Sequence, residues 1–161
     1  MKIIFLDIDG VLNHDQWYVS KEYQSLVEDE NTELDIDPSC ANRLVEICRQ
    51  TNAQIVITSS WRLTWYGTQF RLERGGIPND LILDKTPEFF WVTVGNFDRS
   101  RSAEINTWLE QHQGEVESYV IIDDQPIAKG EQEKHFVHVN PHVGLTEENM
   151  LNAIEILNTN A

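Results

Sequence analysis

The chain has little cysteine, little positive charge and no long apolar run. Its two cysteines, Cys40 and Cys48, lie eight positions apart on one predicted helix. The helical rise separates them by about 12 Å, which is too far for a disulfide. Reduced thiols are typical of the cytosol, so we expect a cytoplasmic protein. No apolar run approaches the roughly 20 residues of a membrane-spanning helix, and we expect no signal peptide.

Basic residues are scarce. The chain has 12 Lys and Arg against 27 Asp and Glu, which gives a formal net charge of −15. This charge argues against a general nucleic-acid binder, because the phosphate backbone would be repelled. Half of the basic residues nevertheless lie within residues 58–101. This concentration favours either a local site for an anion or a mixed, solvated surface.

The 161 residues contain 40% hydrophobic residues, without repeats, low-complexity segments or an evident linker. A chain of this length is large enough to cover both faces of a sheet. We therefore predict one domain over residues 1–161. The acidic stretch 28–37 is predicted to be a surface loop, with a flap over a site as the alternative.

Apolar strand-like segments alternate with segments of helical spacing. This alternation predicts an α/β fold: a Rossmann-like, doubly wound parallel sheet in a three-layer sandwich. A helix is expected from Pro38, capped by Asp37, and another capped by Ser100 or Ser102. The predicted strands are residues 2–7, 54–58, 81–83, 89–94, 119–122 and 135–139.

Two more helices are expected. One lies within residues 61–74 and stops at Gly75-Gly76. The last is capped by Thr146, and its inward residues are predicted to be Met150, Leu151, Ile154 and Leu157.

Polar clusters follow three of the apolar strands. These clusters are Asp7-Ile8-Asp9-Gly10, Thr58-Ser59-Ser60 and Asp123-Asp124. Parallel strands end at one edge of a sheet, where ligands of such folds bind. Neighbouring carboxylates repel each other unless a cation or a proton lies between them. Mg²⁺ prefers oxygen ligands, so we predict a Mg²⁺ site at this edge.

These motifs resemble the haloacid dehalogenase (HAD) superfamily of phosphohydrolases over nearly the whole chain. The matching segments are Asp7-Ile8-Asp9-Gly10-Val11-Leu12, Thr58-Ser59, Arg101-Ser102-Ala103-Glu104-Ile105 and Val120-Ile121-Ile122-Asp123-Asp124. Ser59-Ser60-Trp61-Arg62 and Gly144-Leu145-Thr146 are similar to a narrower set of small HAD proteins, some of them associated with RNA or polynucleotide end repair. The short spacings between the motifs leave no room for a sizeable cap domain.

The resemblance implies a role for each motif. Asp7 is expected to be the nucleophile that forms an aspartyl-phosphate, and Asp9 the general acid and base. Mg²⁺ would be held by Asp7, by the backbone carbonyl of Asp9, and by Asp123 or Asp124.

The phosphoryl oxygens would be bound by a hydroxyl and by a positive charge. Thr58 or Ser59 is expected to donate the hydroxyl. Arg101 is expected to supply the charge, with Arg99 and Lys85 as alternatives.

Ser60, Trp61 and Arg62 are predicted to contact the substrate. Trp61, Trp65 and Tyr66 beside Arg62 form a combination that stacks on bases and binds phosphates. The same aromatic spacing also fits core packing.

The sequence thus predicts a Mg²⁺-dependent phosphomonoesterase, acting on a phosphorylated nucleotide or polynucleotide end. A small-metabolite phosphatase is the enzymatic alternative. A non-catalytic phosphate-binding regulatory domain is the alternative from another class. No membrane partner is expected.

Overall fold

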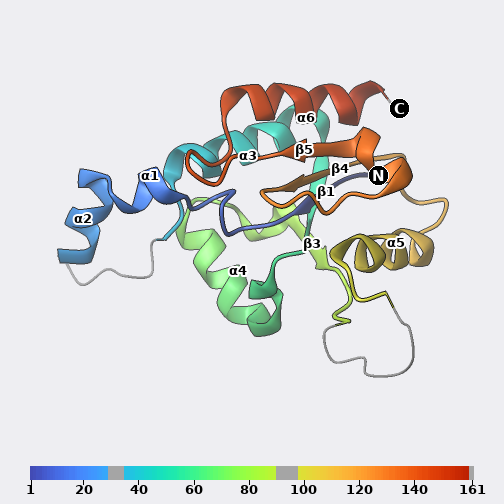
Figure 1. Cartoon of the computed structure of the whole chain (residues 1–161), viewed down its shortest axis with the longest axis horizontal. Coiled ribbons are helices and arrows are strands. Elements are labelled where there is room, and N and C mark those ends of the chain that lie inside the picture. The colour runs from blue at the N-terminus through green and yellow to red at the C-terminus, as the bar shows by residue number, and fades with distance from the viewer. Residues whose placement is uncertain (29–34, 90–97, 160–161) are drawn as a thin grey trace.

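The computed structural model describes residues 1–28, 35–89 and 98–159. Its centre is a five-stranded, all-parallel sheet with strand order β3-β2-β1-β4-β5. This arrangement, with helices on both faces, confirms the predicted three-layer α/β fold (Figure 1). The strands are β1 (Lys2–Leu6), β2 (Ala53–Ile57), β3 (Ile82–Lys85), β4 (Ser118–Asp123) and β5 (Phe136–His138).

Strand β1 lies in the middle of the sheet and is buried on both faces. Ile4 and Leu6 point into one apolar cluster, and Ile3 and Phe5 into the other. This division follows from the two-residue period of a strand. A continuous apolar run is therefore what a central parallel strand requires.

One face is covered by α3 (Pro38–Thr51) and α6 (Glu147–Thr159), which lie side by side (Figure 1). Asp37 caps α3 as predicted, accepting a hydrogen bond from the Ser39 amide at 2.7 Å. Thr146 caps α6, because its hydroxyl accepts from the Asn149 amide.

The inward face of α6 differs from the prediction at one position. Leu151 is 56% exposed, whereas Ala153 and Leu157 are buried. Met150 and Ile154 pack against the cluster from its margin. The inward stripe therefore runs through 150, 153, 154 and 157, and Leu151 lies outside it because it is one position, about 100°, past Met150.

The opposite face is covered by α5 (Arg101–Gln111). Its cap is Ser100, whose hydroxyl accepts from the Ala103 amide; Ser102 is instead buried and donates to Gln132. Trp108 of α5 packs edge-on against Phe5, with ring centroids 5.4 Å apart. This contact fixes α5 over the central strand.

The segment after β2 forms a 3₁₀ turn, η1 (Ser60–Thr64), and then α4 (Trp65–Arg74), which ends at Gly75 as predicted. Leu81 lies in a second 3₁₀ turn, η2 (Asn79–Leu81), rather than in β3. Of the strand predicted over 89–94, Phe89 is outside any strand and residues 90–94 lie outside the described residues. A third turn, η3 (Gly130–His135), precedes β5, so His135 is not in that strand.

Two short helices between β1 and α3 were not predicted: α1 (Asp15–Tyr18) and α2 (Lys21–Glu28). They lie beyond the carboxyl ends of the strands (Figure 1). The Asp15 and Gln16 amides donate to the carbonyls of Pro141 and His142. Helix α1 is thereby tied to the loop between β5 and α6. Residues 29–34 of the predicted loop or flap lie outside the described residues.

Cys40 and Cys48 are both buried and free, as expected from their spacing on α3. Burial raises the pKa of each thiol to about 12. In the described part of the chain, no helix is long and apolar enough to cross a membrane.

Candidate active site

The polar clusters predicted to meet at one edge of the sheet do meet there. The Asp7 amide donates to the carbonyl of Ile122 on β4, and the Thr58 amide to the carbonyl of Leu6 on β1. Asp123 is the last residue of β4. The strand register thus brings the three motifs to the same level of the sheet.

A cavity of about 400 Å³ opens at this edge. Four of the predicted site residues that line it are acidic or basic: Asp7, Asp9, Asp124 and Arg101. Ser60 also lines it, and the remaining lining residues are Gly10, Asn13, His14, Asp15, Tyr18, Gln125 and Pro141.

Asp7, Asp123 and Asp124 form a compact acidic cluster. One carboxylate oxygen from each lies within 4.8 Å of the others. Gly10 makes room for Asp124, because a Cβ atom at position 10 would lie 2.8 Å from its carboxyl carbon. Gly10 also has a φ of +78°, which side-chain-bearing residues rarely adopt. The glycine of the first motif is therefore required by the acid of the fourth.

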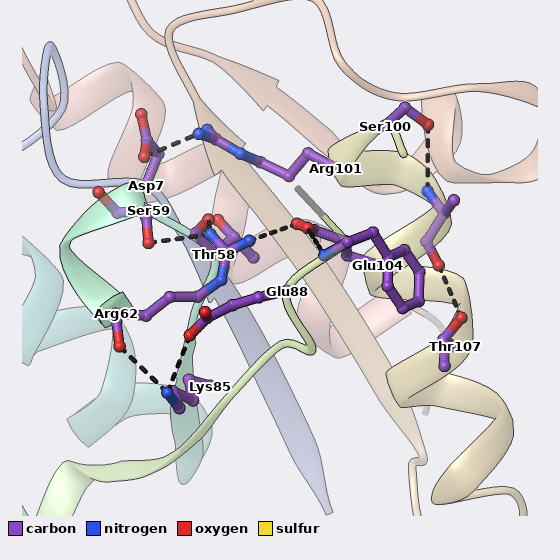
Figure 2. A network of polar contacts seen from close by, with 12 residues as sticks. Asp7, Thr58, Ser59, Arg62, Lys85, Glu88, Ser100, Arg101, Glu104 and Thr107 are labelled. Carbon is purple, nitrogen blue, oxygen red and sulfur yellow. Dashed lines mark hydrogen bonds and ion pairs between the residues drawn. The ribbon is translucent and has the colours of Figure 1, made fainter. Parts of the chain in front are cut away.

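Arg101 bridges two members of this cluster from the first turn of α5. One guanidinium nitrogen, Nη1, lies 3.1 Å from Asp7 Oδ1 and 2.5 Å from Asp123 Oδ2 (Figure 2 shows the pair with Asp7). Of the three basic candidates, Arg101 is in contact with the acids. Lys85 instead donates to the Arg62 carbonyl and pairs with Glu88, and Arg99 is exposed.

Burial makes the negative charge of two acids of the cluster, Asp7 and Asp123, unfavourable. Burial raises the pKa of Asp7 to about 6; Arg101 opposes the shift, and Asp123 and Asp124 add to it. Burial likewise raises the pKa of Asp123, against the effect of Arg101. One guanidinium therefore does not offset the burial of these carboxylates, and an additional cation would be favoured.

The donor set suits a hard divalent cation. All three members of the cluster offer carboxylate oxygens, which Mg²⁺ prefers, and the described residues place no thiolate among them. The chemistry of the site is thus compatible with a divalent metal.

The hydroxyls after β2 lie at different depths. Ser59 is buried, and its Oγ caps η1 by accepting from the Trp61 amide. Thr58 is fully buried, and its Oγ1 has no hydrogen-bond partner among the described residues. Ser60 is exposed at the cavity. An unpartnered buried hydroxyl is a candidate for binding a ligand oxygen.

Arg62, which the sequence predicts to contact the substrate, makes its contacts inside the protein. Its guanidinium is buried, donates to the carbonyls of Thr58 and Ser59, and pairs with Glu104 at 2.6 Å (Figure 2). In a trans peptide the N–H points opposite to the preceding C=O. The carbonyls of Thr58 and Ser59 thereby point toward Arg62, and the next two amides, those of Ser59 and Ser60, point away from it.

The indole of Trp61 contacts two charged side chains of the protein. Its indole Nε1 donates to Asp9 Oδ2 at 3.0 Å, and the guanidinium of Arg71 lies 3.6 Å from its ring centroid. Trp65 packs against the core and near Lys85, whereas Tyr66 is 85% exposed. The aromatic residues that looked alike in the sequence thus have three different environments.

Several cavity residues were missed by sequence reasoning. Asn13 is buried and bridges the first motif, accepting from the Gly10 amide and donating to Asp9, both at 2.9 Å. Its position three residues after Gly10 was the only local signal. Tyr18 and Pro141 come from segments without a motif, and only the fold brings them to the cavity.

A second group of possible metal ligands, His14, Asp37 and Cys40, lies beside the cavity. His14 Nδ1 accepts from the Trp17 amide, while Nε2 lies 2.8 Å from Asp37. A side chain at Gly144 would collide with the His14 ring. Both ring nitrogens of His14 are engaged in structural hydrogen bonds, which fix the position of the ring. Because the fixed ring cannot move aside, position 144 needs a glycine.

The parallel sheet, the motifs at its carboxyl edge and the absence of an inserted cap among the described residues define a capless HAD-type α/β domain. The chain belongs to the family described as "HAD domain in Swiss Army Knife RNA repair proteins", which it matches over residues 3–150. No curated protein and no solved structure gives a significant match.

Proposed function

We propose that this chain is a Mg²⁺-dependent phosphomonoesterase that acts through an aspartyl-phosphate on Asp7. The observation that carries the proposal is the Asp7–Asp123–Asp124 cluster, in which Arg101 bridges Asp7 and Asp123 beside a cavity lined by Asp7, Asp124 and Arg101. We further propose that residues 1–161 act as one domain, and that the buried thiols reflect a cytoplasmic location.

The first half of the reaction joins Asp7 to phosphorus. Asp7 Oδ attacks the phosphoryl group, the bond from phosphorus to the leaving oxygen breaks, and Asp9 gives that oxygen a proton. In the second half a water attacks the aspartyl-phosphate and gives a proton to Asp9. The bond from phosphorus to Asp7 then breaks, and inorganic phosphate is released.

The remaining residues bind and neutralise the phosphoryl group. Arg101 contributes positive charge beside the nucleophile, and the Thr58 hydroxyl and the amides of Ser59 and Ser60 offer hydrogen bonds to phosphoryl oxygens. Asp7, Asp123 or Asp124, and the Asp9 carbonyl would hold Mg²⁺. When bound, the metal lowers the repulsion between the Asp7 carboxylate and the phosphoryl oxygens.

We propose a phosphorylated nucleotide or polynucleotide end as the substrate. The support is the family's association with RNA repair, together with a cavity that no cap closes within residues 1–28, 35–89 and 98–159. The cavity wall is acidic at Asp9, Asp15 and Asp124, which favours a terminal phosphate over a long polyanion track.

The test is a panel of phosphate esters assayed for phosphate release with Mg²⁺ and with EDTA. The panel contains 3′- and 5′-phosphorylated oligonucleotides, mononucleotides and sugar phosphates. Release from oligonucleotide ends that stops in EDTA is the expected result. Turnover of sugar phosphates alone would show that the substrate is a small metabolite. Tight binding of phosphate without any turnover would show that the chain is a phosphate-binding regulatory domain and not an enzyme.

A further inference from the structure

The carboxylate of Asp9 is held from two sides. Trp61 Nε1 donates to Oδ2 at 3.0 Å, and Asn13 Nδ2 donates to Oδ1 at 2.9 Å. Asp9 is itself exposed at the cavity. A carboxylate at such a position would otherwise rotate freely about its terminal torsion.

Trp61 is in turn fixed by the helix that follows it. The Arg71 guanidinium stacks on the indole and forms an ion pair with Asp35. The Thr68 hydroxyl donates to the Trp61 carbonyl at 2.6 Å. The tryptophan therefore has its backbone, its ring face and its N–H engaged.

These contacts give Trp61 a role within the protein itself. Arg71 covers one ring face, which leaves at most the other for a base, and the N–H is directed at Asp9. The hydrogen bond to Asp9 crosses 52 positions of sequence and joins the loop after β1 to the turn after β2.

We propose that Trp61 is a positioning residue for Asp9, setting the direction in which this carboxyl group delivers its proton. The inference rests on the proposed phosphatase function. A carboxyl group has about four lone-pair sites on its two oxygens. Trp61 and Asn13 each use one, which leaves an outward site on each oxygen for the proton. That proton passes to the leaving oxygen as its bond to phosphorus breaks and the bond from Asp7 to phosphorus forms.

The dependence of kcat/KM on the leaving group distinguishes a positioning role of Trp61 from a purely structural one. A 2,4-dinitrophenolate departs without a proton, whereas the alkoxide of β-glycerophosphate requires one. The value of kcat/KM reports only the first half-reaction, in which Asp9 acts as the acid. A misdirected Asp9 should therefore slow the alkyl ester selectively.

The experiment compares Trp61→Phe with the intact chain on both esters in Mg²⁺. We expect kcat/KM for β-glycerophosphate to fall roughly tenfold more than that for 2,4-dinitrophenyl phosphate, a fraction of the 10²–10⁴ that a general acid supplies. In an Asp9→Asn background the same substitution should add no selective loss. Trp65→Phe is the matched control, since Trp65 packs on the core and should affect neither ester.

A second substitution protects the test against misfolding. Benzothienylalanine at position 61 keeps the ring shape and removes only the N–H, and it should reproduce the selective loss. Equal losses on both esters, or a selective loss that persists in the Asp9→Asn background, would overturn the role of Trp61 while leaving the phosphatase intact. An intact chain that releases phosphate neither from these esters nor from phosphorylated oligonucleotide ends would overturn the proposed function, and this role with it.

Discussion

Arg62 and Glu104 form a buried ion pair that joins the turn after β2 to the helix carrying Arg101. Their charged atoms lie 2.6 Å apart, and both side chains are at least nine-tenths buried. The other Glu104 oxygen accepts from the Phe89 amide at 2.9 Å. The turn that presents Thr58 and Ser59, and the first turn of α5, are therefore held to each other by one carboxylate.

Glu104→Ala should destabilise the protein strongly, because it leaves the Arg62 charge buried and unpaired. Losses of about 3–5 kcal/mol are typical of such changes, and urea unfolding would measure this one. Glu46→Ala is the control, since it removes an ion pair with the exposed Arg49 and should change stability little. Equal effects of the two substitutions would contradict the role assigned to Glu104.

Asp7→Asn should abolish turnover and yet stabilise the metal-free protein at neutral pH. The pKa of Asp7 is raised from 3.8 to about 6 in the folded state, so the folded protein binds the proton more tightly than the unfolded chain does. The stability gained from this proton is full below pH 3.8 and is lost as the pH rises past 6.

The size of this effect follows from the shift. Two pKa units correspond to at most about 3 kcal/mol, so the gain from Asp7→Asn should be about 1–3 kcal/mol above pH 6 and should shrink towards pH 4. Unfolding in EDTA at several pH values measures it, with the exposed Asp80→Asn as the control. A stability difference that does not change with pH would count against the buried charge.

Mg²⁺ should raise the melting temperature, because the proposed site exists only where the fold brings the acids together and not in the unfolded chain. At ten times its dissociation constant the gain is about 1.4 kcal/mol, or roughly 3–6 °C for a domain of this size. EDTA should reverse the shift. Asp123→Asn should remove most of the shift. A melting temperature that neither Mg²⁺ nor EDTA changes would contradict the proposed site.

Gly10→Ala should weaken the response to Mg²⁺ as well as the fold. The new methyl would meet the Asp124 carboxyl group at 2.8 Å and push it from its position. Gly76→Ala is a close control: Gly76 also has a positive φ, of +96°, but open space around it. Both variants should lose stability from the backbone, and only Gly10→Ala should also lose the metal-induced shift in calorimetry.

The rate with a polynucleotide end should depend weakly on chain length and salt. The cavity wall is acidic, and Arg62 and Arg71 are committed to Glu104 and Asp35. A 3′-phosphorylated dinucleotide and a 12-mer should therefore have similar kcat/KM values. The plot of log(kcat/KM) against log[salt] should have a slope of only about −1 to −2. A steep slope would indicate an extended basic track.

The motifs and the sheet could be predicted because each depends on short-range patterns. An apolar strand followed by an acid specifies both its burial and its place at the sheet edge, as for Asp7 and Asp123. The role of Arg62 could not be predicted, because its partner Glu104 is 42 positions away and nothing local marks it. Helix α1 is only four residues long, too short for a helical period to show, and α2 contains no buried residue. Leu151 shows that apolar character alone does not place a side chain inside.

The tie between α1 and the loop before α6 has a consequence for biosynthesis. Strands β1, β2 and β3 can pair as soon as they leave the ribosome, but β1 then has an open edge until β4 arrives. The Val11 carbonyl accepts a hydrogen bond from the Leu145 amide, and the Asp15 amide donates to the Pro141 carbonyl. Neither bond can form until the chain after β5 has been synthesised. Asp7 is thus synthesised early in this domain, whereas the cavity around it is completed only when residues 141–145 have been added. A stalled or truncated product would have Asp7 without a working pocket.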